Sequence, residues 1–164
     1  MILGMSLATF TILHVAISLI GIASGLIVLY GLLKGRLLSP WNGIFLLFTV
    51  LTSVTGFFFP ITKATPGVIL GILSLIVLAI ALFALYAFHL KGGWRTTYAV
   101  TALIALYFNC FVLVAQLFMK VPALHALAPT GTEAPFKIAQ LLLLIITIVL
   151  ITMAARKFRH ALPV

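Results

Sequence analysis

The 164-residue chain has little charge and almost no negative charge. Only 7% of its residues are charged, and Glu133 is the single acidic side chain. It also has one cysteine, Cys110, which excludes a disulfide-rich secreted scaffold, a dithiol redox site and a cysteine-rich metal site. With Glu133 as the single acid, the chain cannot form a carboxylate pair, which excludes catalysis by paired carboxylates and proton pumping through buried carboxylates.

What the chain has in excess is apolar surface. Hydrophobic residues make up 65% of it, and its mean hydropathy is +1.38. Soluble domains average about 45–50% apolar and about 25% charged residues. A water-soluble fold of this length has too little interior to bury so many apolar side chains. The composition therefore predicts a polytopic membrane protein and excludes a soluble enzyme and a disordered chain.

The apolar residues fall into five segments separated by proline, glycine and basic residues. A helix needs about 20 apolar residues to cross the hydrocarbon core, and the five segments reach or approach this length. We expect an all-α, membrane-embedded bundle of five transmembrane helices in one domain, residues 1–164, with helices over roughly 9–33, 43–60, 67–90, 96–119 and 138–155. The first segment lacks a basic region before it and is long for a signal peptide, so we expect a retained helix.

The ten basic residues predict how the helices are oriented. Seven fall on one side of the predicted topology: Lys34, Arg36, Lys91, Arg95, Arg156, Lys157 and Arg159. Three fall on the other: Lys63, Lys120 and Lys137. The richer side is expected to be cytoplasmic, which puts the N-terminus outside and the C-terminus inside. An aromatic belt is expected at the same boundary, made of Tyr30, Trp41, Tyr86, Trp94 and Tyr98. Basic residues at the ends of apolar runs favour contact with lipid headgroups over binding of nucleic acid, despite the net charge of +9.

Small and polar residues recur at helical spacing along each segment. Such faces serve first as contacts between helices, because small side chains let backbones approach. With alternating helix directions, however, several strongly polar side chains gather in the outward half of the bundle. Polar groups inside a membrane are costly and point to a functional site. We therefore expect an outward-facing polar pocket, with hydrogen bonding between helices as the alternative, formed by His14, Ser18, Asn109, Gln116, Gln140 and Thr147.

The segment Val121–Pro135 is too apolar for an ordinary solvated loop. We expect a short half-buried lid that carries His125 and Glu133, and a flexible loop at the headgroups is the alternative. His14 and His89 lie about 20 Å or more apart in depth, too far to bind one haem. His14 and His125 could share a metal only if the loop folds inward, and no diagnostic spacing supports it. No metal site is assigned, and the cofactor remains unknown.

Three stretches carry a resemblance: Ser53–Pro60, His89–Arg95, and the region from Leu106–Asn109 to Ala128–Thr130. In these stretches the chain resembles a family of small bacterial polytopic inner-membrane proteins that has no named function. The resemblance covers most of the chain and implies a multi-pass protein of the bacterial inner membrane. It implies no activity and no residue roles.

The resulting functional hypothesis is a non-catalytic integral membrane protein with a pocket for a small or lipid-like ligand. The first alternative is an accessory subunit of a larger membrane complex, favoured if the Gly21/Gly25 or Gly67/Gly71 faces point outward. The second is a b-type haem or quinone redox protein. The expected partner is the lipid bilayer, with a homo-oligomer or a larger complex left open and nucleic acid excluded.

Overall fold

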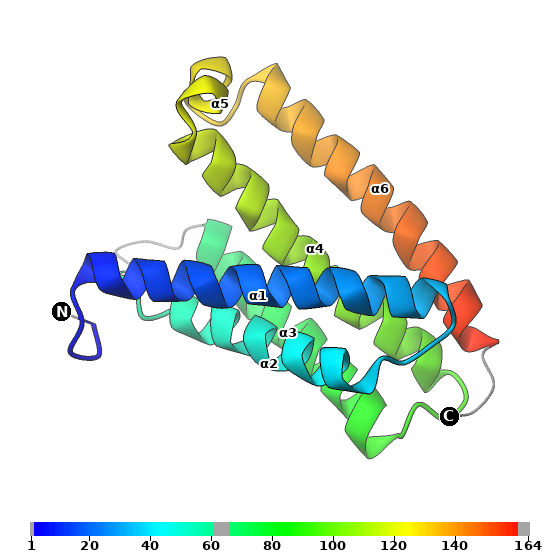
Figure 1. The fold of residues 1–164 in the computed structure, drawn as a ribbon. Coiled ribbons are helices and arrows are strands. Elements are labelled where there is room, and N and C mark those ends of the chain that lie inside the picture. The colour runs from blue at the N-terminus through cyan, green and yellow to red at the C-terminus, as the bar shows by residue number, and fades with distance from the viewer. Residues whose placement is uncertain (1, 61–65, 161–164) are drawn as a thin grey trace.

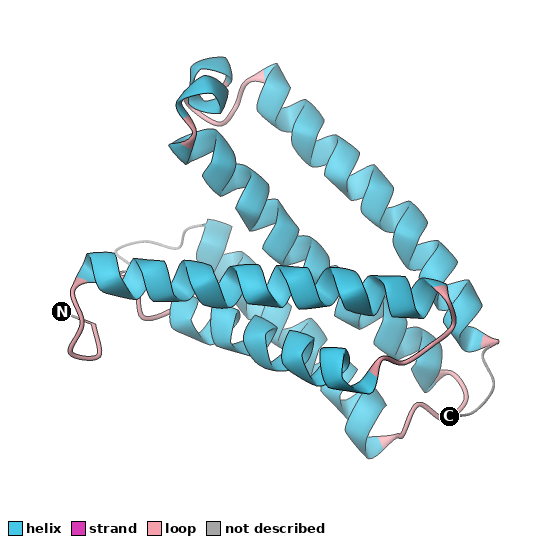
Figure 2. Cartoon of the chain, in the orientation of Figure 1, coloured by secondary structure: helices cyan, strands magenta, loops and turns pink. Residues whose placement is uncertain are grey.

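The structure is a computed structural model that describes residues 2–60 and 66–160. Apart from one bridge between Ile2 and Met5, its regular elements are helices (Figure 2). They are α1 Leu7–Leu33, α2 Ser39–Gly56, α3 Pro66–Leu82, the π-helical turn η1 Phe83–Ala87, α4 Trp94–Lys120, α5 Pro122–Leu127 and α6 Ala134–Arg159. Proline stands in the first turn of α2, α5 and α6, where its missing N–H costs nothing.

Four of these helices are long and apolar enough to cross a membrane: Leu7–Leu33, Pro66–Ala87, Trp94–Lys120 and Ala134–Arg159. The fifth long helix, α2, has only 18 residues, and several of them are hydroxyl or amide side chains. It begins before the predicted segment 43–60 and ends at Gly56. An all-helical fold with four helices able to cross a membrane is therefore confirmed, whereas a fifth membrane crossing stays a prediction. Lys63, which contributed to the predicted orientation, lies outside the described residues.

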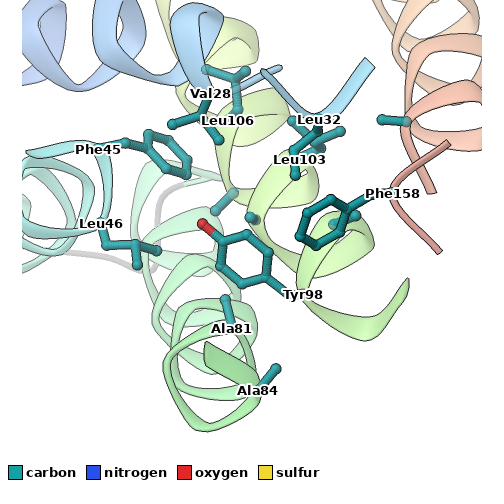
Figure 3. Packing of buried hydrophobic residues seen from close by; sticks show 14 of the residues in the cluster. Val28, Leu32, Phe45, Leu46, Ala81, Ala84, Tyr98, Leu103, Leu106 and Phe158 are labelled. Atoms are coloured by element: carbon teal, nitrogen blue, oxygen red, sulfur yellow. The ribbon is translucent and has the colours of Figure 1, made fainter. Parts of the chain in front are cut away.

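The packed core lies at one end of the bundle, which we call the basic end. Here α1 and α6 end, α4 begins, and the predicted cytoplasmic Lys and Arg residues cluster (Figure 1). The core is drawn from this end of five helices (Figure 3): Val28, Leu32, Phe45, Leu46, Leu78, Ala81, Ala84, Tyr98, Ala99, Ala102, Leu103, Ala105, Leu106, Ala154, Ala155 and Phe158. Alanines at every turn of α4 between Ala99 and Ala105 let the other helices approach its backbone.

Away from the basic end, the helices separate into two groups (Figure 1). In the first, the start of α1 packs against the turn that follows α2, where the Phe10 ring lies 5.1 Å from Phe59. In the second, α4 and α6 pack against each other, and the rings of Phe118 and Phe136 lie 5.5 Å apart. Figure 1 shows the α4–α6 pair diverging from α1 toward α5. The molecule is thus a wedge that is closed at the basic end.

The small-residue faces of α1 and α3 point into the protein. A Cβ on Gly21 would lie 3.5 Å from the Thr49 hydroxyl of α2. A Cβ on Gly25 would lie 2.6 Å from Leu106, and one on Gly71 would lie 3.0 Å from Phe57. These three glycines therefore make close contacts within the chain, whereas Gly67 at the start of α3 is exposed, so the accessory-subunit alternative stays a prediction.

One member of the predicted aromatic belt is wrongly placed by sequence reasoning. Tyr98 is fully buried, and its hydroxyl donates a hydrogen bond to the side-chain oxygen of Asn42 in α2. Tyr98 follows Trp94 by one turn and shares its face of α4, and this face packs against the core, where Trp94 is half-buried. Figure 3 shows its ring between Phe158 and Ala81. Tyr30, Trp41 and Tyr86 are exposed by 61%, 42% and 60%, as an interfacial belt requires.

Candidate functional site

A cavity of about 170 Å³ lies where the two helix groups begin to diverge. It is lined by three helices, α1, α4 and α6, and is partly open, because Leu26 and Ile146 in its lining are 52% and 55% exposed. It lies beside the packed core, which shares Leu103 and Leu106 with it. Its lining is Leu26, Leu29, Leu103, Leu106, Tyr107, Cys110, Leu143, Ile146, Thr147, Leu150 and Ile151.

The lining residues follow from helical periodicity. On α6 they recur at intervals of three and four from Leu143 to Ile151, and on α4 from Leu103 to Cys110, so each set forms one face of its helix. The lining has no charged group, and its polar atoms are the Thr147 hydroxyl, the Cys110 thiol and the Tyr107 hydroxyl. Such a surface suits a hydrocarbon chain, because it has few polar atoms whose hydration would be lost.

His14 lies in the other helix group, on α1. Its Nδ1 is 2.7 Å from the Thr55 hydroxyl of α2, and its ring packs edge-on against Phe59 with centroids 5.2 Å apart. Ser18 donates a hydrogen bond of 2.7 Å to the His14 carbonyl within the same helix. The His14 contact therefore matches the alternative of hydrogen bonding between helices, whereas the Ser18 hydrogen bond stays within α1.

The amides of α4 and α6 lie elsewhere. Gln140 donates a 3.1 Å hydrogen bond to the backbone carbonyl of Phe111, joining α6 to α4. Gln116 is exposed, whereas Asn109 is 9% exposed. Among the described residues, the Asn109 side-chain nitrogen and the Gln140 side-chain oxygen are buried without a hydrogen-bond partner. Of the six predicted pocket residues, Thr147 lines the cavity. The structure does not bring His14, Gln116 and Gln140 into one site.

The predicted lid lies at the tip of the α4–α6 hairpin (Figure 1). His125 is exposed on α5, a short helix that interrupts the expected loop. The carboxylate of Glu133 accepts hydrogen bonds from the Thr130 hydroxyl at 2.8 Å and from the N–H groups of Thr130 and Thr132 at 3.1 and 3.0 Å. Desolvation raises the pKa of Glu133, but these hydrogen bonds outweigh it and lower the pKa to about 2.

Neither a metal site nor a known relative provides a further guide. In residues 2–60 and 66–160, no group of three or more His, Cys, Asp or Glu side chains could hold a metal ion. Comparison with known proteins finds no matching family model, no matching curated protein and no matching solved structure. The resemblance to small bacterial inner-membrane proteins stays a prediction. The cavity between α1, α4 and α6 is therefore the feature that bears on function.

Sequence reasoning missed most of the cavity because it searched for polar groups. The signal that could have found it is present on α6, where leucine and isoleucine side chains surround the helix and Gln140, Thr147 and Thr152 are the only polar residues between Lys137 and Arg156. An apolar cavity lining and a lipid-facing surface have the same composition, so the sequence does not distinguish the two. The partner of Tyr98, Asn42, precedes the predicted segment 43–60 by one residue, so its position gave no signal of a buried role.

Proposed function

We propose that this protein is a non-catalytic, multi-pass protein of the bacterial inner membrane that binds the hydrocarbon chain of a lipid between α1, α4 and α6. The observation that carries this proposal is the apolar cavity of about 170 Å³ at the base of the wedge. Its occupant is a lipid chain because the surrounding solvent is the bilayer and the lining offers no charge. The outward-facing polar pocket of the sequence prediction is replaced here by an apolar one.

The proposed orientation places the basic end in the cytoplasm and α5 outside. The wedge then opens toward the outer leaflet, and its base lies near the middle of the bilayer. Both α4 and α6 exceed the thickness of the hydrocarbon core, since 27 and 26 residues at 1.5 Å per residue give about 40 Å. A tilt of these two helices accommodates the excess length and agrees with their divergence from α1.

A cavity-filling variant tests the proposal. Thr147→Trp puts an indole into the cavity, whereas Ile145→Trp adds the same group to a side chain of α6 that is 49% exposed. Each protein is reconstituted with phosphatidylcholine and phosphatidylglycerol of 16- and 18-carbon chains. Retained lipids are counted by native mass spectrometry as the collision energy is raised.

The wild type and Ile145→Trp are expected to retain one lipid at energies that remove the remainder, and Thr147→Trp is expected to lose it. Helical circular dichroism controls for folding of each variant. Equal retention by the two tryptophan variants, or rapid loss of every lipid from the wild type, contradicts the proposal. A stoichiometric protein subunit, haem or quinone in the same spectra supports one of the alternative functions instead.

A further inference from the structure

A second hollow, of about 290 Å³, lies at the basic end where α1 ends. It is lined by Tyr30, Gly31, Lys34, Arg36 and Leu38. The chain turns sharply here because Gly35 adopts a positive φ of 68°, which glycine tolerates. The Arg36 N–H bonds to the Gly31 carbonyl at 2.8 Å and the Gly35 N–H bonds to Leu32 at 3.0 Å. These hydrogen bonds satisfy carbonyls in the last turn of α1, so the side chains of Lys34 and Arg36 are the dominant charges of the hollow.

The charges of Lys34 and Arg36 have no acidic counterpart in the chain. The only acidic side chain, Glu133, lies at the opposite end of the bundle and accepts hydrogen bonds from Thr130 and Thr132. Lys34 Nζ lies 5.9 Å from the centre of the Tyr30 ring, a cation–π distance that leaves its charge uncompensated. In the described part of the chain, no acidic side chain lies beside these two cations, so the hollow has the charge that an anionic ligand would complement.

A continuous surface connects this hollow to the apolar cavity. Leu26, Tyr30 and Lys34 follow one another at four-residue spacing, so they lie on one face of α1. Leu26 lines the apolar cavity and Tyr30 lines the hollow. Their side chains are 52% and 61% exposed, so no other part of the described chain covers this path. From Leu26 to Lys34 the helix rises about 12 Å, a distance well within the reach of an acyl chain.

We propose that the hollow at Lys34 and Arg36 binds the phosphate headgroup of an anionic phospholipid whose acyl chain enters the cavity between α1, α4 and α6. This inference rests on the proposed function and adds the headgroup class and the leaflet to it. The cations bind the phosphate, Tyr30 lies at the level of the glycerol backbone, and Leu26 directs the chain into the cavity. On the proposed orientation, the lipid comes from the cytoplasmic leaflet, in which basic pockets of this kind bind anionic headgroups.

Charge variants test the headgroup site with a matched control. Lys34→Gln combined with Arg36→Gln removes both cations from the hollow. Lys91→Gln combined with Arg156→Gln also removes two positive charges from the basic end, at positions outside the hollow. Binding of phosphatidylglycerol and phosphatidylcholine to each protein is measured in detergent micelles by native mass spectrometry titration.

Each juxtamembrane cation strengthens the binding of an anionic lipid about fivefold, so the first variant should bind phosphatidylglycerol roughly 25-fold more weakly. The control should change by less than about threefold, and phosphatidylcholine binding should be similar in all three proteins. Glycerol phosphate, a soluble headgroup without acyl chains, should not displace the lipid.

The outcomes separate this inference from the proposed function. Equal binding of both lipids by every protein, with loss in Thr147→Trp, supports the chain cavity and overturns the headgroup site. Equal weakening in the two charge variants indicates general attraction to the basic end and also overturns it. Displacement by glycerol phosphate overturns the assignment to a lipid, and absence of any retained lipid overturns both proposals.

Discussion

Gly25 lies where α1, α2 and α4 meet, and its lack of a side chain lets the three helices pack closely. A Cβ at this position would lie 2.6 Å from a Leu106 methyl and 2.9 Å from the Phe45 ring. Gly25→Ala should therefore lower the free energy of unfolding by about 1–3 kcal/mol through overpacking. Gly43→Ala is the control, because a Cβ there meets nothing within 4 Å, and it should stabilise α2 by about 0.5–1 kcal/mol.

Unfolding in mixed micelles, followed by circular dichroism as the fraction of sodium dodecyl sulfate rises, measures both changes. A Gly25→Ala variant as stable as Gly43→Ala would mean that the three helices do not meet at this position.

Individual polar residues show what a sequence can and cannot predict at this scale. Helical spacing predicted that His14, Ser18, Gly21 and Gly25 share one face of α1, and Gly21 and Gly25 do pack against α2. The partner of His14, the Thr55 hydroxyl, was not predictable, because it depends on how far α2 extends along α1. Depth alone placed Gln140 near His14, but depth does not determine on which side of the bundle a residue lies.

The loop before α6 is a small element whose structure depends on one carboxylate. Glu133 accepts hydrogen bonds from Thr130 and Thr132, and its pKa falls to about 2 from an ordinary value near 4.3. A carboxyl group with a lowered pKa stabilises the folded loop above its unfolded pKa and loses this effect as pH falls through the folded pKa. The loop should therefore remain ordered at pH 4 and lose its Glu133 contacts only as pH approaches 2.

Amide resonances of Thr130 and Thr132, recorded by NMR in micelles from pH 7 to pH 2, report the transition. Glu133→Gln should shift both resonances at pH 7 and abolish their titration. A titration midpoint near 4.3 in the wild type would show that the carboxylate does not hold the loop.

At the scale of helices, the apolar runs and their breaks predicted five helical segments, and the observed helices overlap each of them. The exception in detail is α5, which forms within a segment that contains three prolines. Pro122 stands at the start of this helix, where its fixed φ favours the first turn, so proline content alone was a poor guide. Hydropathy also does not decide whether α2 crosses the membrane, because its polar residues Asn42, Thr49 and Ser53 are buried against protein rather than exposed to lipid.

The divergence of the α4–α6 pair from α1 could not be predicted from the sequence. The angle between helices in a membrane depends on how side chains pack, and both helices carry apolar residues on nearly every face. Packing residues of small size are concentrated at one end of α4, from Ala99 to Ala105, which explains why the bundle closes there. Toward the other end, larger residues such as Phe111 and Phe118 fill the contact with α6 and favour the hairpin over a closed bundle.

The distribution of positive charge predicts the orientation of the whole molecule, and labelling of single cysteines tests this prediction. Cys110 is first replaced by alanine, which leaves a background without cysteine. Reporter cysteines then replace Arg36, Phe58, Lys91 and His125, one at a time, in the segments between helices. If all five long helices cross the membrane, a membrane-impermeant maleimide should label positions 58 and 125 in intact cells. Positions 36 and 91 should react only after permeabilisation, because the proposed orientation puts the basic end in the cytoplasm. Reaction of positions 36 and 58 from the same side would show that α2 does not cross the membrane. Labelling of position 91 in intact cells would show that the orientation is the reverse of the proposed one, with the proposed anionic headgroup site in the outer leaflet.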